Sequence, residues 1–146
     1  MKPLKDYQER VLDSLQSFFR QCSKDGRPEA AFQSVKLQNN QVPTPYIPVY
    51  SAGLKPGMPY VCLRVPTGGG KTLLACHAAG IAMKSLLRAD RAVVLWLVPG
   101  NTILDQTAEA LRDPRHFYRR ALELACGAVE VVTIEEALRL SRATAS

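Results

Sequence analysis

A glycine-rich segment near the middle of the chain carries the residue types that bind a triphosphate. In order, the segment consists of Val65, Pro66, Thr67, Gly68, Gly69, Gly70, Lys71 and Thr72. Successive glycines let backbone N–H groups approach phosphate oxygens closely, because no Cβ stands in the way. The Lys71 ammonium can reach the β- and γ-phosphates. The Thr72 hydroxyl can ligate Mg²⁺ at a helix N-terminus, whose dipole favours anions. We therefore expect a nucleotide site in which Lys71 and Thr72 lie closest to the chemistry.

The flanking residues favour this interpretation over a glycine-rich turn that merely caps a helix. The strict phosphate-loop pattern has glycine at the position of Val65, but the Pro-Thr-Gly-x-Gly-Lys-Thr variant fits, with Pro66 setting the turn. Residues 60–63 form a short apolar run typical of a strand, and residues 73–87 form a longer run typical of a helix. Strand, loop and helix in this order are the arrangement that a bound triphosphate requires.

Apolar spacing predicts alternating helices and strands along the chain. Helices are expected over about 5–22, 28–36, 101–112, 114–126 and 134–141, and further strands over 92–98 and 129–132. Asn101 or Thr102 can cap the third of these helices, and Thr133 and Glu136 have the spacing of a capping box for the last. Residues 23–59 are rich in proline and are expected to form a long functional or mobile insertion. The order predicts a single α/β domain over residues 1–146, with a mainly parallel sheet flanked by helices.

Charge and cysteine usage narrow the class of protein. The net charge of +6 is compatible with a polyanionic partner. Five basic residues recur at helical spacing, so either a nucleic-acid face or a solvated helix face is possible: Arg112, Arg115, His116, Arg119 and Arg120. No apolar run approaches the ~20 residues of a membrane span, and the N-terminus lacks a signal sequence. The four cysteines are scattered, which favours reduced thiols in a cytoplasmic protein over a metal site.

Three motifs in order resemble the first motifs of a superfamily-2 helicase. Leu4-Lys5-x-Tyr7-Gln8 resembles the adenine-reading Q motif, and residues 65–72 resemble motif I. Residues 96–99 (Trp-Leu-Val-Pro), with Leu104, Gln106 and Thr107 after them, resemble motif Ia. The residues of motifs I and Ia are most similar to those of the Res (motor) subunit of type III restriction enzymes and its DEAD/DEAH-box relatives. The resemblance implies a P-loop NTPase with a RecA-like sheet, which binds ATP and Mg²⁺ and moves on nucleic acid.

The resemblance also implies roles for particular residues. Gln8 would hydrogen-bond the adenine edge, and Tyr7 would either pack near the base or simply belong to the apolar stripe of its helix. Residues 99–106 would contact a nucleic-acid phosphate, most naturally of double-stranded DNA, although the chain has Pro99-Gly100-Asn101 where motif Ia usually has Pro-Thr-Arg. Gln106 is equally explained as a helix-surface residue. A modification or specificity subunit would be a further partner.

The acidic pair that hydrolysis requires is not evident in the sequence. Cleavage of a γ-phosphate needs an Asp that holds Mg²⁺ and a Glu that activates water. Glu135 and Glu136 follow a predicted strand, but the capping box explains them better. The chain therefore resembles the N-terminal part of a first RecA-like domain, with an incomplete sheet. The alternatives are a nucleotide-binding module that a partner completes, without hydrolysis of its own, and a small P-loop kinase.

Overall fold

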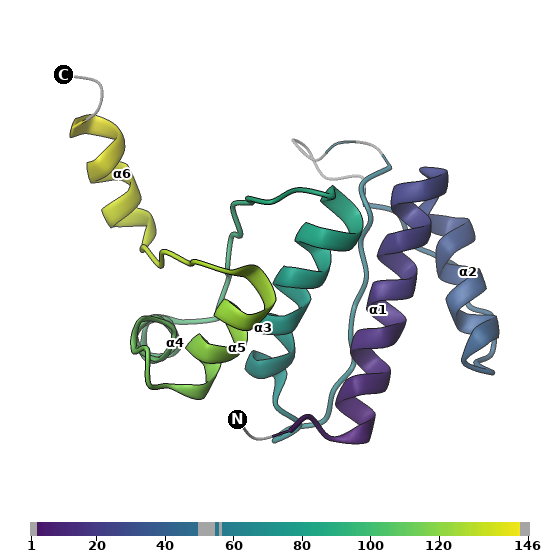
Figure 1. Cartoon of the computed structure of the whole chain (residues 1–146). Helices are drawn as coiled ribbons and strands as arrows, with labels where there is room; N and C mark the ends of the chain where they lie inside the picture. Colours follow the sequence, from purple (N-terminus) through teal and green to yellow (C-terminus); the bar gives the residue numbers. More distant parts are fainter. Residues whose placement is uncertain (1–2, 50–54, 56, 144–146) are drawn as a thin grey trace.

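A computed structural model describes residues 3–49, 55 and 57–143 of the chain. Within these residues the regular structure is entirely helical. The elements are α1 (Asp6–Asp25), α2 (Pro28–Gln38), α3 (Lys71–Ile81), η1 (Ala82–Leu87), α4 (Asn101–Arg112), α5 (Phe117–Cys126) and α6 (Ile134–Ala143). Figure 1 shows α1, α3 and α5 side by side, with α2 outside α1 and α6 standing apart near the C-terminus. No described helix is both long and apolar enough to cross a membrane.

The predicted parallel sheet is absent from the described residues, so the RecA-like fold class was wrong for this structure. Residues 60–65, 92–98 and 129–132 are not paired with one another as strands. Several side chains of the predicted strand 92–98 face solvent, with Val93 fully exposed and Leu97 78% exposed. A strand is held by hydrogen bonds to a neighbouring strand, and its apolar character alone does not supply that neighbour.

The helices agree with the sequence pattern much more closely. The first helix extends to Asp25, where Gly26 takes a left-handed conformation with φ of 64° and ends it. The helix after the glycine loop continues beyond α3 as the π-helical turn η1, up to Arg88. Two starts differ from expectation: Gly100 precedes α4 without a side-chain cap, and α5 begins at Phe117 rather than near Pro114.

Helices α3 and α5 pack closely against each other. Both Cys76 of α3 and Ala121 of α5 are fully buried, and Ala79, Leu111 and Leu122 complete this core cluster. Gly80 allows the close approach, because a Cβ at this position would lie 2.6 Å from both the Cβ and the carbonyl oxygen of Ala125. The α3–α5 pair therefore fixes the helix that follows the glycine loop.

A second cluster fixes the extended chain that leads into the loop. Figure 1 shows this chain descending beside α1 to the end of the molecule where both α1 and α3 begin. Val65 is buried there together with Leu12 of α1 and Leu74 of α3, and Tyr7 packs against them. The predicted insertion also packs on α1, since Tyr46 lies against Phe18, although residues 50–54 and 56 of it lie outside the described part. The loop is thus held between two helices.

Candidate nucleotide site

The glycine loop forms a tight turn at the start of α3. The N–H of Gly69 donates to the Pro66 carbonyl at 3.0 Å, which closes the turn. Gly68 and Gly70 have φ of 75° and 81°, in the left-handed region where a Cβ is strained. A Cβ on Gly69 would lie 2.5 Å from Cγ1 of Val65 and 2.8 Å from the Pro66 carbonyl oxygen. Each glycine of the run is therefore required by the loop geometry, for conformation or for space.

The N-terminus of α3 presents the predicted phosphate-binding groups. Gly70 is the N-cap of the helix, and the first helical hydrogen bond runs from the Leu74 N–H to the Gly70 carbonyl at 2.9 Å. The N–H groups of Lys71, Thr72 and Leu73 precede this bond, as in the first turn of any α-helix, and need partners from outside the helix. Lys71 is exposed and Thr72 is half-buried. The donor set is thus the one that suits a Mg²⁺-bound triphosphate.

Two residues of the predicted Q motif lie directly on this loop. The Tyr7 hydroxyl donates to the Gly69 carbonyl at 2.8 Å, and the Gln8 amide Nε2 donates to the same oxygen at 2.9 Å. Gln8 is buried, and its Oε1 accepts from the Lys5 N–H at 3.0 Å, at the start of α1. The contacts join residues about sixty positions apart in sequence. The structure therefore brings the first two predicted motifs together.

The third predicted motif lies in an exposed stretch before and within α4. Pro99 and Gly100 lie outside the helix, and Asn101, Thr102 and Gln106 are exposed along its first turns. No hydrogen bond of the described residues ties Asn101, Thr102 or Gln106 through its side chain to another residue. The side chains of these three residues are therefore available to a ligand at the start of α4.

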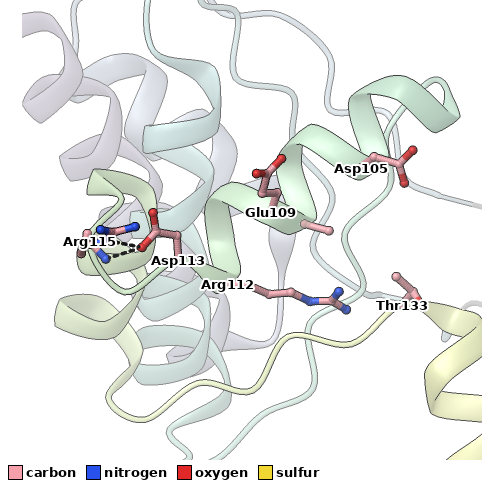
Figure 2. Close-up of a pocket in the computed structure, with 7 residues that line it drawn as sticks. Asp105, Glu109, Arg112, Asp113, Arg115 and Thr133 are labelled. Carbon is pink, nitrogen blue, oxygen red and sulfur yellow. Dashed lines mark hydrogen bonds and ion pairs between the residues drawn. The ribbon is translucent and has the colours of Figure 1, made fainter.

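An open hollow of about 590 Å³ lies on the other part of α4, away from the glycine loop. Figure 2 shows Asp105 and Glu109 on α4, with Asp113 and Arg115 bonded to each other just beyond it. The lining carries three carboxylates and two arginines: Asp105, Glu109, Asp113, Arg112 and Arg115. Because acidic groups outnumber basic ones in this lining, the hollow itself is a poor site for a polyanion.

The five predicted basic residues do not share one helix face. Arg112 ends α4, Arg115 and His116 lie between helices, and His116 caps α5 by accepting from the Tyr118 N–H at 3.2 Å. The arginines are largely committed to protein partners. Arg112 donates to the Val131 carbonyl and pairs with Glu136. Arg119 donates to Leu111, Val129 and Glu123. These residues therefore mainly join segments of the protein to one another.

Glu136 occupies the predicted capping box. Its carboxylate accepts from the Thr133 N–H at 2.7 Å, and its own N–H donates to the Thr133 hydroxyl at 3.3 Å. The Thr133 N–H and then the Arg112 guanidinium hold the pKa of Glu136 below its ordinary value. The capping interpretation of Glu136 is confirmed, and the carboxylate is engaged in structural contacts.

Comparison with known proteins agrees with the motifs. The family model described as type III restriction enzyme, res subunit, matches residues 1–138. No curated protein and no solved structure matches the chain. The matched residues include Tyr7 and Gln8, the glycine loop and the start of α4, so the resemblance drawn from the three motifs is confirmed. The chain therefore belongs to the type III restriction enzyme res-subunit family, whose members are ATP-dependent, helicase-type P-loop proteins that act on nucleic acid.

Proposed function

We propose that the chain binds Mg-ATP on the glycine loop as part of an ATP-dependent DNA helicase or translocase. The system would be a type III restriction–modification system or a related DEAD/DEAH-box helicase, with a modification or specificity subunit as partner. The backbone of residues 66–70 would surround the phosphates, Lys71 would neutralise them, and Thr72 would ligate Mg²⁺. Gln8 would hydrogen-bond the adenine.

One observation carries the proposal: Gln8 of α1 hydrogen-bonds the glycine loop that leads into Lys71. Its Nε2 bonds the Gly69 carbonyl, and Oε1 bonds Lys5, yet an amide NH₂ has a second hydrogen and an amide oxygen a second lone pair. These remaining positions match the donor and acceptor pattern of the adenine edge. A base held at Gln8 and a phosphate chain held at Lys71 would therefore belong to one ligand.

Removal of the Lys71 ammonium tests the nucleotide site. We expect the affinity for Mg-ATP to fall by at least about tenfold in Lys71→Ala, because the glycine loop itself supplies only partial charges. Isothermal titration calorimetry of the full chain measures this. Lys24→Ala is the matched control, because Lys24 is an exposed lysine in the last turn of α1, about 24 Å along that helix from Gln8. Equal affinity of Lys71→Ala and the parent would remove the phosphate-loop assignment.

The start of α4 is the proposed nucleic-acid contact. Helix N-termini and exposed hydroxyl or amide groups bind phosphates without reading sequence. The acidic residues Asp105 and Glu109 lie further along the same helix, so the contact would be confined to residues 99–102 and Gln106. We expect an Asn101→Ala, Thr102→Ala double variant to weaken binding of double-stranded DNA, measured by fluorescence anisotropy. Unchanged affinity over a range of salt concentrations would remove this contact.

A second candidate function is a nucleotide-binding module that a partner completes. Glu136 favours it. Glu135 and Glu136 are the nearest counterpart in the sequence to the acidic pair, and the Glu136 carboxylate is engaged with Thr133 and Arg112. Hydrolysis needs an acidic group that is free to orient water. We expect the chain to bind Mg-ATP without multiple turnover, alone or with DNA. Lys71-dependent, multiple-turnover phosphate release would contradict this and return Glu135 and Glu136 to consideration as catalytic acids.

A further inference from the structure

Two donors from α1 converge on one carbonyl of the glycine loop. The Tyr7 hydroxyl and the Gln8 amide both donate to the Gly69 oxygen, at 2.8 and 2.9 Å. Gln8 is itself held from behind, because its Oε1 accepts from the Lys5 N–H. Gly69 and Gln8 are both buried. The Gly69 carbonyl is therefore fixed in direction by two independent hydrogen bonds.

Fixing this carbonyl also fixes a donor on the opposite side of the same peptide. The carbonyl of Gly69 and the N–H of Gly70 belong to one planar trans peptide unit, so they point in opposite directions. Glycine flanks this peptide on both sides, and glycine tolerates both signs of φ, so a rotation of the whole peptide unit is sterically easy. Without the two bonds, the Gly70 N–H could turn away from the helix start as readily as it turns toward it.

The ring of Tyr7 packs in the core, and its hydroxyl is the group that contacts the loop. The ring packs against the buried cluster of Leu12, Val65 and Leu74, which holds α1 against the chain that leads into the loop. The position of Gly70 fits the same arrangement, since a Cβ there would lie 2.6 Å from the Gln8 amide nitrogen. Gly70 thus supplies both the left-handed conformation of the N-cap and the space that Gln8 occupies.

We propose that Tyr7 is a positioning residue for phosphate binding: with Gln8, it locks the Gly69–Gly70 peptide so that the Gly70 N–H is held toward the phosphate site. This inference rests on the proposed nucleotide site and assigns Tyr7 a role in it other than contact with the base. Tyr7 acts through the loop backbone. Its effect is therefore on the phosphate part of the ligand, whatever the base.

The test removes the hydroxyl and keeps the ring. Tyr7→Phe is titrated with Mg-ATP and with Mg-tripolyphosphate, which has the phosphate chain and no base. The loss of one hydrogen bond predicts about fivefold weaker binding of both ligands, by the same factor. Without ligand, the NMR amide signal of Gly70 should broaden in Tyr7→Phe, because the peptide then exchanges between orientations on a microsecond to millisecond timescale. Tyr118→Phe on α5 is the matched control.

The possible outcomes separate this inference from the proposed function. If only Mg-ATP binding falls, Tyr7 acts on the base and the lock is refuted. If both affinities and the Gly70 signal are unchanged in Tyr7→Phe, the lock is also refuted. If the parent protein binds neither ligand, the proposed nucleotide function fails, and the Gly70 amide signal alone then decides whether the lock exists. A fall in both affinities with a broadened Gly70 signal supports it.

Discussion

Substitution of Gly80 by alanine tests the packing that positions the helix after the glycine loop. Gly80 lies where α3 crosses α5, and its neighbour there is the backbone of α5. A Cβ would be 2.6 Å from the Ala125 carbonyl oxygen and 2.7 Å from its carbonyl carbon. Carbon atoms in ordinary contact are about 3.5–4.0 Å apart. The two helices must therefore separate by about 1 Å, because backbone atoms cannot rotate away as a flexible side chain can.

The magnitude follows from two opposing contributions. Overpacking of a close-packed core costs about 1–3 kcal/mol, and this site should lie toward the upper end because the clash is with backbone. Alanine in the middle of a helix gains about 1 kcal/mol over glycine. We therefore expect Gly80→Ala to lower the free energy of unfolding by about 1–2 kcal/mol. Without the clash the same change would raise it, so the sign of the effect is diagnostic.

Urea denaturation followed by tryptophan fluorescence measures this change. Trp96 is the single tryptophan and packs against the α3–α5 core, so its emission reports on the affected region. Gly100→Ala is the control, because nothing lies within 4 Å of a Cβ at Gly100. Ala125→Gly in the Gly80→Ala background should restore only part of the stability, since it removes one of the clashing atoms. An unchanged or higher stability of Gly80→Ala would refute the close α3–α5 crossing.

Two further predictions concern the contacts that hold the C-terminal helices. Arg119→Met should lower the free energy of unfolding by about 2–4 kcal/mol, because a mostly buried guanidinium loses its bonds to two backbone carbonyls and to a carboxylate. Arg120 is an exposed neighbour on α5, so Arg120→Met is the control. Equal losses of stability in the two variants would show that the Arg119 contacts do not hold the helices. The second prediction is pH-dependent. The pKa of Glu136 is lowered in the fold, so its contribution to stability is present above the ordinary glutamate pKa and is lost as the pH falls through the lowered value. An NMR titration of the Glu136 carboxyl should show the lowered pKa. Thr133→Val with Arg112→Met should raise this pKa only part of the way to its ordinary value, because the backbone N–H at position 133, the largest cause of the shift, remains.

The helices and the family could be predicted from the sequence because their signals are local. A helix satisfies its own backbone within four residues, so the apolar spacing of α1 and the capping box of α6 are sufficient to place them. The glycine run is equally local, since its left-handed residues and the helix start after it are adjacent in the chain. Such features also identify the family, because each motif is a short run of particular residues that can be recognised without the fold.

The tertiary structure decided every feature that depends on a distant partner. Residues 92–98 have the apolar composition of a strand, but a strand forms only against a neighbour, and among the described residues no such pairing occurs. The basic residues near Arg112 have helical spacing, yet a turn separates them, and carboxylates pair with three of the arginines, Arg112, Arg115 and Arg119. The sequence leaves Tyr7 either near the base or on the apolar stripe of its helix, and only the folding of α1 onto the loop places its hydroxyl on the Gly69 carbonyl. Composition and spacing describe what a segment can do alone, whereas sheet pairing, charge pairing and the contacts of the loop are set by which segments meet in space.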